Sequence, residues 1–168
     1  MSKEIVNRVQ KSGIVTIDFD DFVIPNIYKI DLKDWLVDDF FLVEKNFRDA
    51  INQHNWKTYS NSYVCIFCSN DAIIPQWAYM LLSSKISEFT NKVIVGKSDQ
   101  LYEKIYHDHI ENLNLDNYKN KPVVVKGCSS NKVPKTAYYL ITSKLKDIAK
   151  SIMYGEACSA VPVYKKPK

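Results

Sequence analysis

The sequence lacks any long hydrophobic run and contains very little arginine. No stretch approaches the roughly 20 apolar residues of a membrane-spanning helix, and the charged start, Met1–Arg8, has no apolar segment of the signal-peptide type. Arginine occurs only at positions 8 and 48, which disfavours the dense basic patch of a nucleic-acid-binding protein. These absences predict a soluble, cytoplasmic protein with no membrane partner and no nucleic-acid partner.

Two further patterns are incomplete. The segment Gly96-Lys97-Ser98 resembles the end of a phosphate-binding loop, but Asn91 occupies the position where the motif needs glycine. The four cysteines, in a reducing compartment, are too few to indicate a disulfide framework. We therefore expect free thiols or metal ligands.

The length of 168 residues and the apolar fraction of 46% predict one domain with one core, over residues 1–168. Strand-like segments begin near Ser62, Lys92 and Pro122, and each is followed by a helical pattern. This spacing is typical of βα units, whose strands are parallel and whose strand-to-helix turns share one edge of a sheet.

From these units we predict a three-layer α/β fold with a mostly parallel central sheet.

The chain divides into three regions within this domain. Residues 1–60 are expected to form a helix over 2–10, strands near 14–19 and 27–31, and a helix over about 42–54. The prediction allows the two N-terminal strands to pair antiparallel with the rest of the sheet. Residues 61–155 form the βα repeats, with a last helix over about 134–154, and 156–168 form a C-terminal segment with a basic tail.

A Cys-Ser pair recurs where chemistry is expected. Cys68 and Cys128 each follow an apolar strand-like segment and precede a helix, and Cys158 opens a third pair. Ligands of parallel sheets bind at the carboxyl ends of the strands. The favoured hypothesis is a thiolate site of Cys68, Cys128 and Cys158, with Asp71, a histidine or solvent as the fourth ligand. Sulfur donors favour zinc, or iron alone or in an iron–sulfur cluster.

Two alternatives stay open. In the first, the protein is an enzyme in which Cys68 is the nucleophile, Asp71 or a histidine carries the proton, and helix N-termini hold a small anionic substrate. In the second, the protein is an interaction module whose cysteines are structural. A homo-oligomer is compatible with each of these hypotheses. The sequence names neither a substrate nor a reaction.

Two other pairs of residues look like sites but are not predicted to act as such. Cys65 and Cys68 form a Cys-x-x-Cys sequence within a strand, where residues three apart point to opposite faces, so Cys65 is expected in the core. His107 and His109 are two residues apart on an expected helix and point in different directions there. They would share a metal only if that helix ended before them.

Three segments resemble those of a known bacterial family. They are Cys68-Ser-Asn-Asp-Ala-Ile-Ile-Pro-Gln-Trp-Ala-Tyr79, Lys126-Gly-Cys-Ser129 and Gly155-Glu-Ala-Cys-Ser-Ala-Val-Pro162. The sequence is similar, over nearly its whole length, to a family of uncharacterised bacterial proteins defined by a domain of unknown function. The resemblance implies a complete small bacterial protein and carries no reaction, cofactor or catalytic residue with it.

Overall fold

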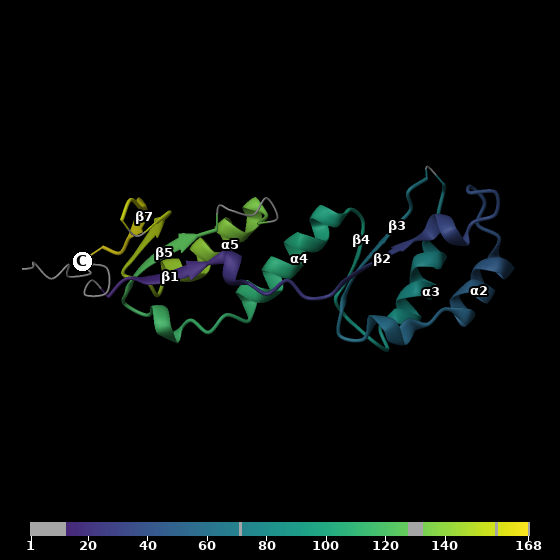
Figure 1. Cartoon of the computed structure of the whole chain (residues 1–168), viewed down its shortest axis with the longest axis horizontal. Coiled ribbons are helices and arrows are strands. Elements are labelled where there is room, and N and C mark those ends of the chain that lie inside the picture. Colours follow the sequence, from purple (N-terminus) through teal and green to yellow (C-terminus); the bar gives the residue numbers. More distant parts are fainter. Residues whose placement is uncertain (1–12, 71, 128–132, 157, 168) are drawn as a thin grey trace, which may run out of the picture. The chain divides into compact units, whose positions relative to one another are not determined.

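A computed structural model describes residues 13–70, 72–127, 133–156 and 158–167 of the chain. These residues fall into two compact units, and Figure 1 labels their elements. Unit 1 comprises the chain up to Val23 and from Ile105 onward, and unit 2 comprises Ile24–Lys104. Each unit contains a sheet and a hydrophobic core of its own.

Unit 2 is a run of βα units. Its elements in chain order are β2 (Ile27–Asp31), the 3-10 helix η2 (Leu32–Trp35), α2 (Glu44–Gln53), η3 (Trp56–Tyr59), β3 (Tyr63–Phe67), α3 (Gln76–Ile86) and β4 (Val93–Val95). The strands are all parallel in the order β2-β3-β4. Because each crossover moves to the next strand in the same direction, α2 and α3 lie on one side of the sheet (Figure 1). The carboxyl ends of the three strands therefore meet at one edge.

The core of unit 2 lies between this sheet and its two helices. Phe47 and Ile51 on α2, four residues apart, are buried with Leu82 of α3 and Val64 of β3. The first four residues of β3 are all buried, as expected for a central strand that is covered on both faces. This packing fixes the position of the residue that follows the strand, Cys68.

Unit 1 has a four-stranded sheet. Its elements are β1 (Val15–Asp18), η1 (Phe19–Asp21), η4 (Asp116–Tyr118), β5 (Pro122–Lys126), α5 (Lys135–Lys146), β6 (Ser151–Tyr154) and β7 (Val161–Lys165), while α4 (Ser98–Glu111) contains the boundary between the units. The strand order is β1-β5-β6-β7, in which only the β6–β7 pair is antiparallel. The core of this unit includes Phe19, Val125 and Ile141.

The α/β class and the parallel βα repeats predicted from the sequence are confirmed. The strands, however, form two sheets rather than one central sheet, because β5 pairs with β1 and not with β4. The N-terminal strands β1 and β2 both pair parallel, and the antiparallel pair lies at the C-terminal end of the chain instead. Spacing along the chain reveals a βα unit but does not reveal which distant strand it pairs with.

The predicted last helix is wrong beyond Lys146. Residues Ser151–Tyr154 form the strand β6, whereas the sequence suggested a helix as far as Tyr154. Ala149 and Met153 continue the four-residue spacing of Ile141 and Leu145 in α5, so the helical pattern hides the change. The helix expected over residues 2–10 lies outside the described residues.

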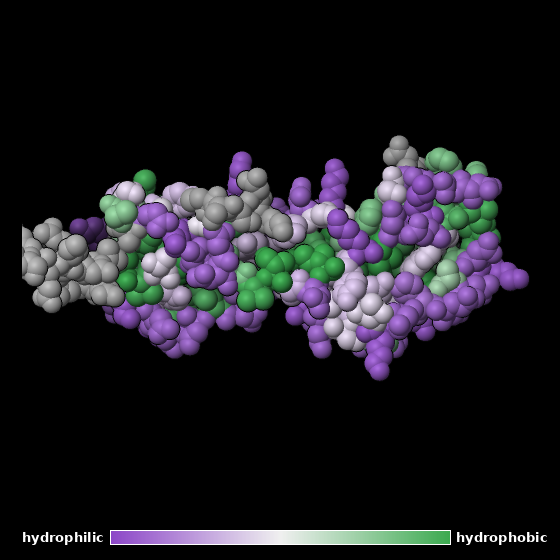
Figure 2. Space-filling model, in the orientation of Figure 1, coloured by the Kyte–Doolittle hydropathy of each residue, from purple (hydrophilic) through white to green (hydrophobic). Residues whose placement is uncertain are grey.

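The surface is mostly hydrophilic, as Figure 2 shows for the face in view. Some large apolar side chains are nevertheless exposed, among them Phe41, Ile73 and Val163. Among the described residues, none of the helices combines the length and the apolar character needed to cross a lipid bilayer.

Candidate functional site

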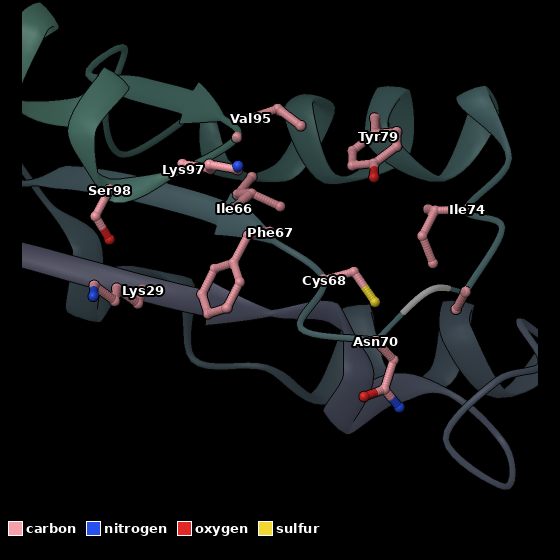
Figure 3. A pocket seen from close by; sticks show the side chains of 12 residues that line it. Lys29, Ile66, Phe67, Cys68, Asn70, Ile74, Tyr79, Val95, Lys97 and Ser98 are labelled. Atoms are coloured by element: carbon pink, nitrogen blue, oxygen red, sulfur yellow. The ribbon is translucent and has the colours of Figure 1, made fainter.

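A pocket of about 680 Å³ lies at the carboxyl edge of the β2-β3-β4 sheet, entirely within unit 2 (Figure 3). Its walls come from the end of β3, the turn after it, the first turn of α3 and the junction of β4 with α4. The lining residues are Lys29, Ile66, Phe67, Cys68, Asn70, Ala72, Ile74, Tyr79, Val95, Gly96, Lys97 and Ser98. The volume lies within the range of small-molecule sites, roughly 300–1,000 Å³.

The turn that carries Cys68 is tied to the neighbouring strand. Asp31, the last residue of β2, accepts hydrogen bonds from the backbone N–H groups of Ser69 and Lys33, both at 3.0 Å. Burial opposes ionisation of Asp31, but hydrogen bonds from the side chain and backbone of Ser69 and from Lys33 outweigh it and lower the pKa of this carboxyl. The carboxylate therefore holds the turn directly beside the thiol.

On the β4 side of the pocket, hydrogen bonds fix the backbone of Gly96, the glycine that follows the strand. The N–H of Gly96 donates to the carbonyl of Ile66 at 2.9 Å, and its carbonyl accepts from the buried thiol of Cys65 at 3.2 Å. The Gln100 side chain lies where a Cβ of Gly96 would be and accepts from the N–H of Lys97 at 2.8 Å. These bonds position the start of α4 at the pocket.

Two lysines, Lys29 and Lys97, give the lining of the pocket positive charge. Within the described part of the chain, neither Lys29 nor Lys97 forms an ion pair with an acidic side chain. In Figure 3 Lys29 and Ser98 lie toward one end, and the sulfur of Cys68 points away from them. A ligand whose acidic group is bound by the lysines and the N-terminus of α4 would therefore have to be an extended molecule if its other end is to reach the thiol.

Tyr79 of α3 lines the pocket together with Cys68, and its pKa depends on the charge of the thiol. Burial, together with the negative charge of an ionised Cys68, raises the pKa of Tyr79 above its usual range. The phenol therefore keeps its proton at neutral pH and can donate a hydrogen bond in the pocket. Phe67, Ile74 and Val95 supply apolar surface.

At the carboxyl edge of the unit 1 sheet, two acidic side chains neutralise the charge of the lysine that ends β5. Lys126, at the end of β5, contacts the carboxylate of Asp18 at 2.8 Å and that of Glu156 at 3.8 Å. The hydrogen bond from Lys126 is the main cause that lowers the pKa of Asp18, and it raises the pKa of Lys126 in turn. Cys158 is exposed in the turn after β6.

The strands that precede the three cysteines predicted to form one thiolate site belong to two different sheets. Cys68 follows β3 in unit 2, and Cys158 belongs to unit 1. Cys128 and the predicted fourth ligand or proton carrier, Asp71, lie outside the described residues, although β5, which precedes Cys128, belongs to the other sheet from β3. In the described ranges, no group of three or more His, Cys, Asp or Glu side chains could hold a metal ion.

The secondary interpretations are confirmed. Cys65 lies in β3 and is 1% exposed, so it is the core residue that the sequence predicted. His107 and His109 both lie on α4, where residues two apart diverge. The His109 ring contacts the carbonyl of Val23 at 3.0 Å, so it has a structural contact.

Three lining residues were missed by the sequence analysis. Lys29 looks like an ordinary solvent-facing strand residue, and Tyr79 looks like part of the apolar stripe of a helix. Asn70 donates to the carbonyl of Asp39 at 2.8 Å, a contact with a loop 31 residues away. The predicted parallel βα units place Lys97 and Ser98, which follow β4, at the same edge as Cys68, but the sequence did not identify them as binding residues.

Comparison with known proteins places the chain in a family. The family described as a protein of unknown function (DUF2480) matches residues 3–166, and the chain belongs to it. No curated protein and no solved structure matches the chain.

Proposed function

We propose that this DUF2480 protein binds a small organic anion in the pocket at the carboxyl edge of β2-β3-β4, with Cys68 as the nucleophile that acts on it. The observation that carries the proposal is the composition of one cavity: a half-buried thiol, two lysines and the start of α4 line the same 680 Å³ space. Long-range attraction to cations and helix N–H groups favours anions over neutral molecules.

The geometry supports an extended ligand. Its acidic group would lie toward Lys29 and Ser98, which Figure 3 shows at one end, and its reactive carbon would lie near the sulfur of Cys68 and the phenol of Tyr79. Addition of Cys68 to a carbonyl carbon of the ligand would form a carbon–sulfur bond, the π electron pair of the carbonyl would move onto its oxygen, and the thiol proton would pass to solvent. The protonated Tyr79 would donate a hydrogen bond to that oxygen. Asp71, the predicted proton carrier, stays a prediction.

A zinc or iron site made by Cys68, Cys128 and Cys158 also stays a prediction, and none of the described contacts favours it over the anion pocket. We further propose a cytoplasmic location, because the proposed chemistry needs a reduced thiol and reducing compartments preserve one.

A protection experiment tests the proposed function. Iodoacetamide alkylation of the full-length protein is followed by peptide mass spectrometry in the presence of glycerol phosphate or citrate, with glycerol as the uncharged control. The anions are expected to slow alkylation of Cys68 at millimolar concentration and to leave the exposed Cys158 unaffected. The double variant Lys29→Met/Lys97→Met should lose this protection.

Two outcomes would overturn the proposal. One is equal protection of Cys68 by glycerol and by the anions, because charge would then play no part. The other is stoichiometric zinc or iron in protein purified without chelator that disappears in Cys68→Ser, which would favour the thiolate metal site instead.

A further inference from the structure

A second cavity lies in unit 1, on the side of the sheet that faces α5. It has a volume of about 560 Å³, again in the range of ligand sites. Its lining residues come from α5 and from strands β5, β6 and β7: Val125, Tyr138, Tyr139, Thr142, Ser143, Lys146, Ile152, Met153, Tyr154 and Val163. None of them belongs to the pocket around Cys68.

The cavity exists because α5 does not extend over the edge strand. Ala137, Ile141 and Leu145 of α5 are fully buried in the core with residues of β5 and β6. Strand β7 lies one position further out in the sheet, and its Val163 is 53% exposed. A groove therefore remains between α5 and β7, with the buried Ile152 among its lining residues.

One end of the groove is aromatic and rigid. The rings of Tyr138 and Tyr154 meet edge to face with centroids 5.7 Å apart, and the hydroxyl of Tyr138 donates to the carbonyl of Gly127 at 2.6 Å. Tyr139 is next along α5 and 73% exposed, and Met153 adds a polarisable thioether. Aromatic rings and thioethers pack well against a planar aromatic ring.

The other end is polar and cationic. Thr142, Ser143 and Lys146 follow the tyrosines by one to two turns of α5. Among the described residues, Lys146 is the only charged one that lines the groove. An aromatic end and a single cation together match a molecule with an aromatic body and one acidic group.

We propose that this groove is a binding site for a small aromatic acid, with the ring packed against Tyr138, Tyr139 and Tyr154 and the acidic group at Lys146. The site is independent of the pocket around Cys68. Charge complementarity favours this occupant over a neutral molecule, because the described lining residues include one lysine and no acidic side chain.

Two fluorescent probes that differ mainly in charge test the proposal on the full-length protein. Anilinonaphthalene sulfonate carries the aromatic body and one acidic group, and phenylnaphthylamine is close to its uncharged counterpart. The sulfonate is expected to bind more tightly than the neutral probe. Lys146→Met should weaken binding of the sulfonate about fivefold and leave binding of phenylnaphthylamine unchanged.

Strand β7 supplies a matched pair of variants. Val163→Glu puts a carboxylate into the groove and should weaken sulfonate binding at least about tenfold. Val161→Glu adds the same charge to the same strand at an exposed residue that does not line the groove, and it should have little effect. Circular dichroism of both variants checks that the fold is intact.

Three results would overturn the proposal. The first is equal weakening by the two β7 variants. The second is loss of sulfonate binding in Lys29→Met/Lys97→Met but not in Val163→Glu, which would assign the probe to the other pocket. The third is a dimer, seen by sedimentation, that Val163→Glu dissociates, which would assign the groove to a second copy of the chain.

Discussion

The carboxyl edges of the two sheets are built alike but use their charge differently. In unit 1, Lys126 at the end of β5 is bound by Asp18 at 2.8 Å, and Glu156 lies nearby. In unit 2, no described acid forms an ion pair with Lys29 or Lys97, and both line a pocket with Cys68. At the first edge the lysine of β5 is paired with Asp18 of β1, whereas under the proposed function the lysines of the second edge bind an anionic ligand.

The largest predicted difference between the two edges is the loss of stability when the glycine that follows a strand is replaced by alanine. Gly127 has a φ of +139°, and a Cβ there would lie 2.6 Å from the Cβ of the fully buried Phe19. Gly96 has a φ of +149°, but the added Cβ would meet only the flexible end of Gln100. Backbone strain affects both positions, while overpacking against a rigid core affects only the first.

We therefore expect Gly127→Ala to lower the free energy of unfolding by about 3 kcal/mol and Gly96→Ala by about 1 kcal/mol. Urea unfolding followed by circular dichroism measures both values. Tryptophan fluorescence reports on unit 2 alone, since Trp35, Trp56 and Trp77 all lie there. Equal losses for the two variants would mean that the edges are packed alike.

A second prediction compares the lysines themselves. Lys126→Met leaves the carboxylate of Asp18 without its main partner, so the melting temperature should fall and the pKa of Asp18 should rise toward its usual value. Since a lowered pKa stabilises the fold above the unfolded value near 3.8, the variant should also lose less stability on acidification below that value.

Lys97→Met is the matched control, because none of the described acidic side chains forms an ion pair with Lys97. Its melting temperature should stay close to that of the wild type. A loss of stability similar to that of Lys126→Met would show that Lys97 is structural, and it would remove the contrast between the two edges.

Local patterns predicted the strands, because β1, β2, β3 and β5 are short apolar runs between turn residues. They did not predict two sheets, since β5 pairs with β1, more than a hundred residues earlier in the chain. Pairing over that distance depends on the packing of whole layers and leaves no local signal. The same limit led the sequence analysis to expect Cys68 and Cys128 at one edge.

The candidate site was predictable only in part. Cys68 stood out because a thiol follows a buried strand, and the N-terminus of α4 was expected at the same edge. Lys29 gave no signal, because a single lysine in a strand is typical of a solvent-facing position. Its importance comes from the pocket that the fold forms beside it.

The third and smallest predicted effect is a pH dependence confined to unit 2. Burial among aromatic rings lowers the pKa of His54, whose Nε2 lies 2.6 Å from the hydroxyl of Tyr59. The unfolded chain therefore takes up the proton first, so stability is greatest above the unfolded pKa near 6.5 and falls as the pH falls through the lowered value.

His54→Gln removes this titrating group. Urea unfolding of unit 2, followed by tryptophan fluorescence at pH 7 and pH 5, should show a smaller loss of stability on acidification in the variant than in the wild type. An equal loss in both would assign the pH dependence to other groups.

The most direct test of the account compares two thiols of the same molecule with two reagents of different charge. Iodoacetate is an anion and iodoacetamide is neutral, so the ratio of their alkylation rates reports the local potential at each sulfur. We expect this ratio to be about fivefold higher at Cys68 than at the exposed Cys158, and to fall in Lys29→Met/Lys97→Met. Equal ratios at both thiols, unchanged by the lysine substitutions, would contradict the claim that unit 2 keeps its positive charge for an anionic ligand.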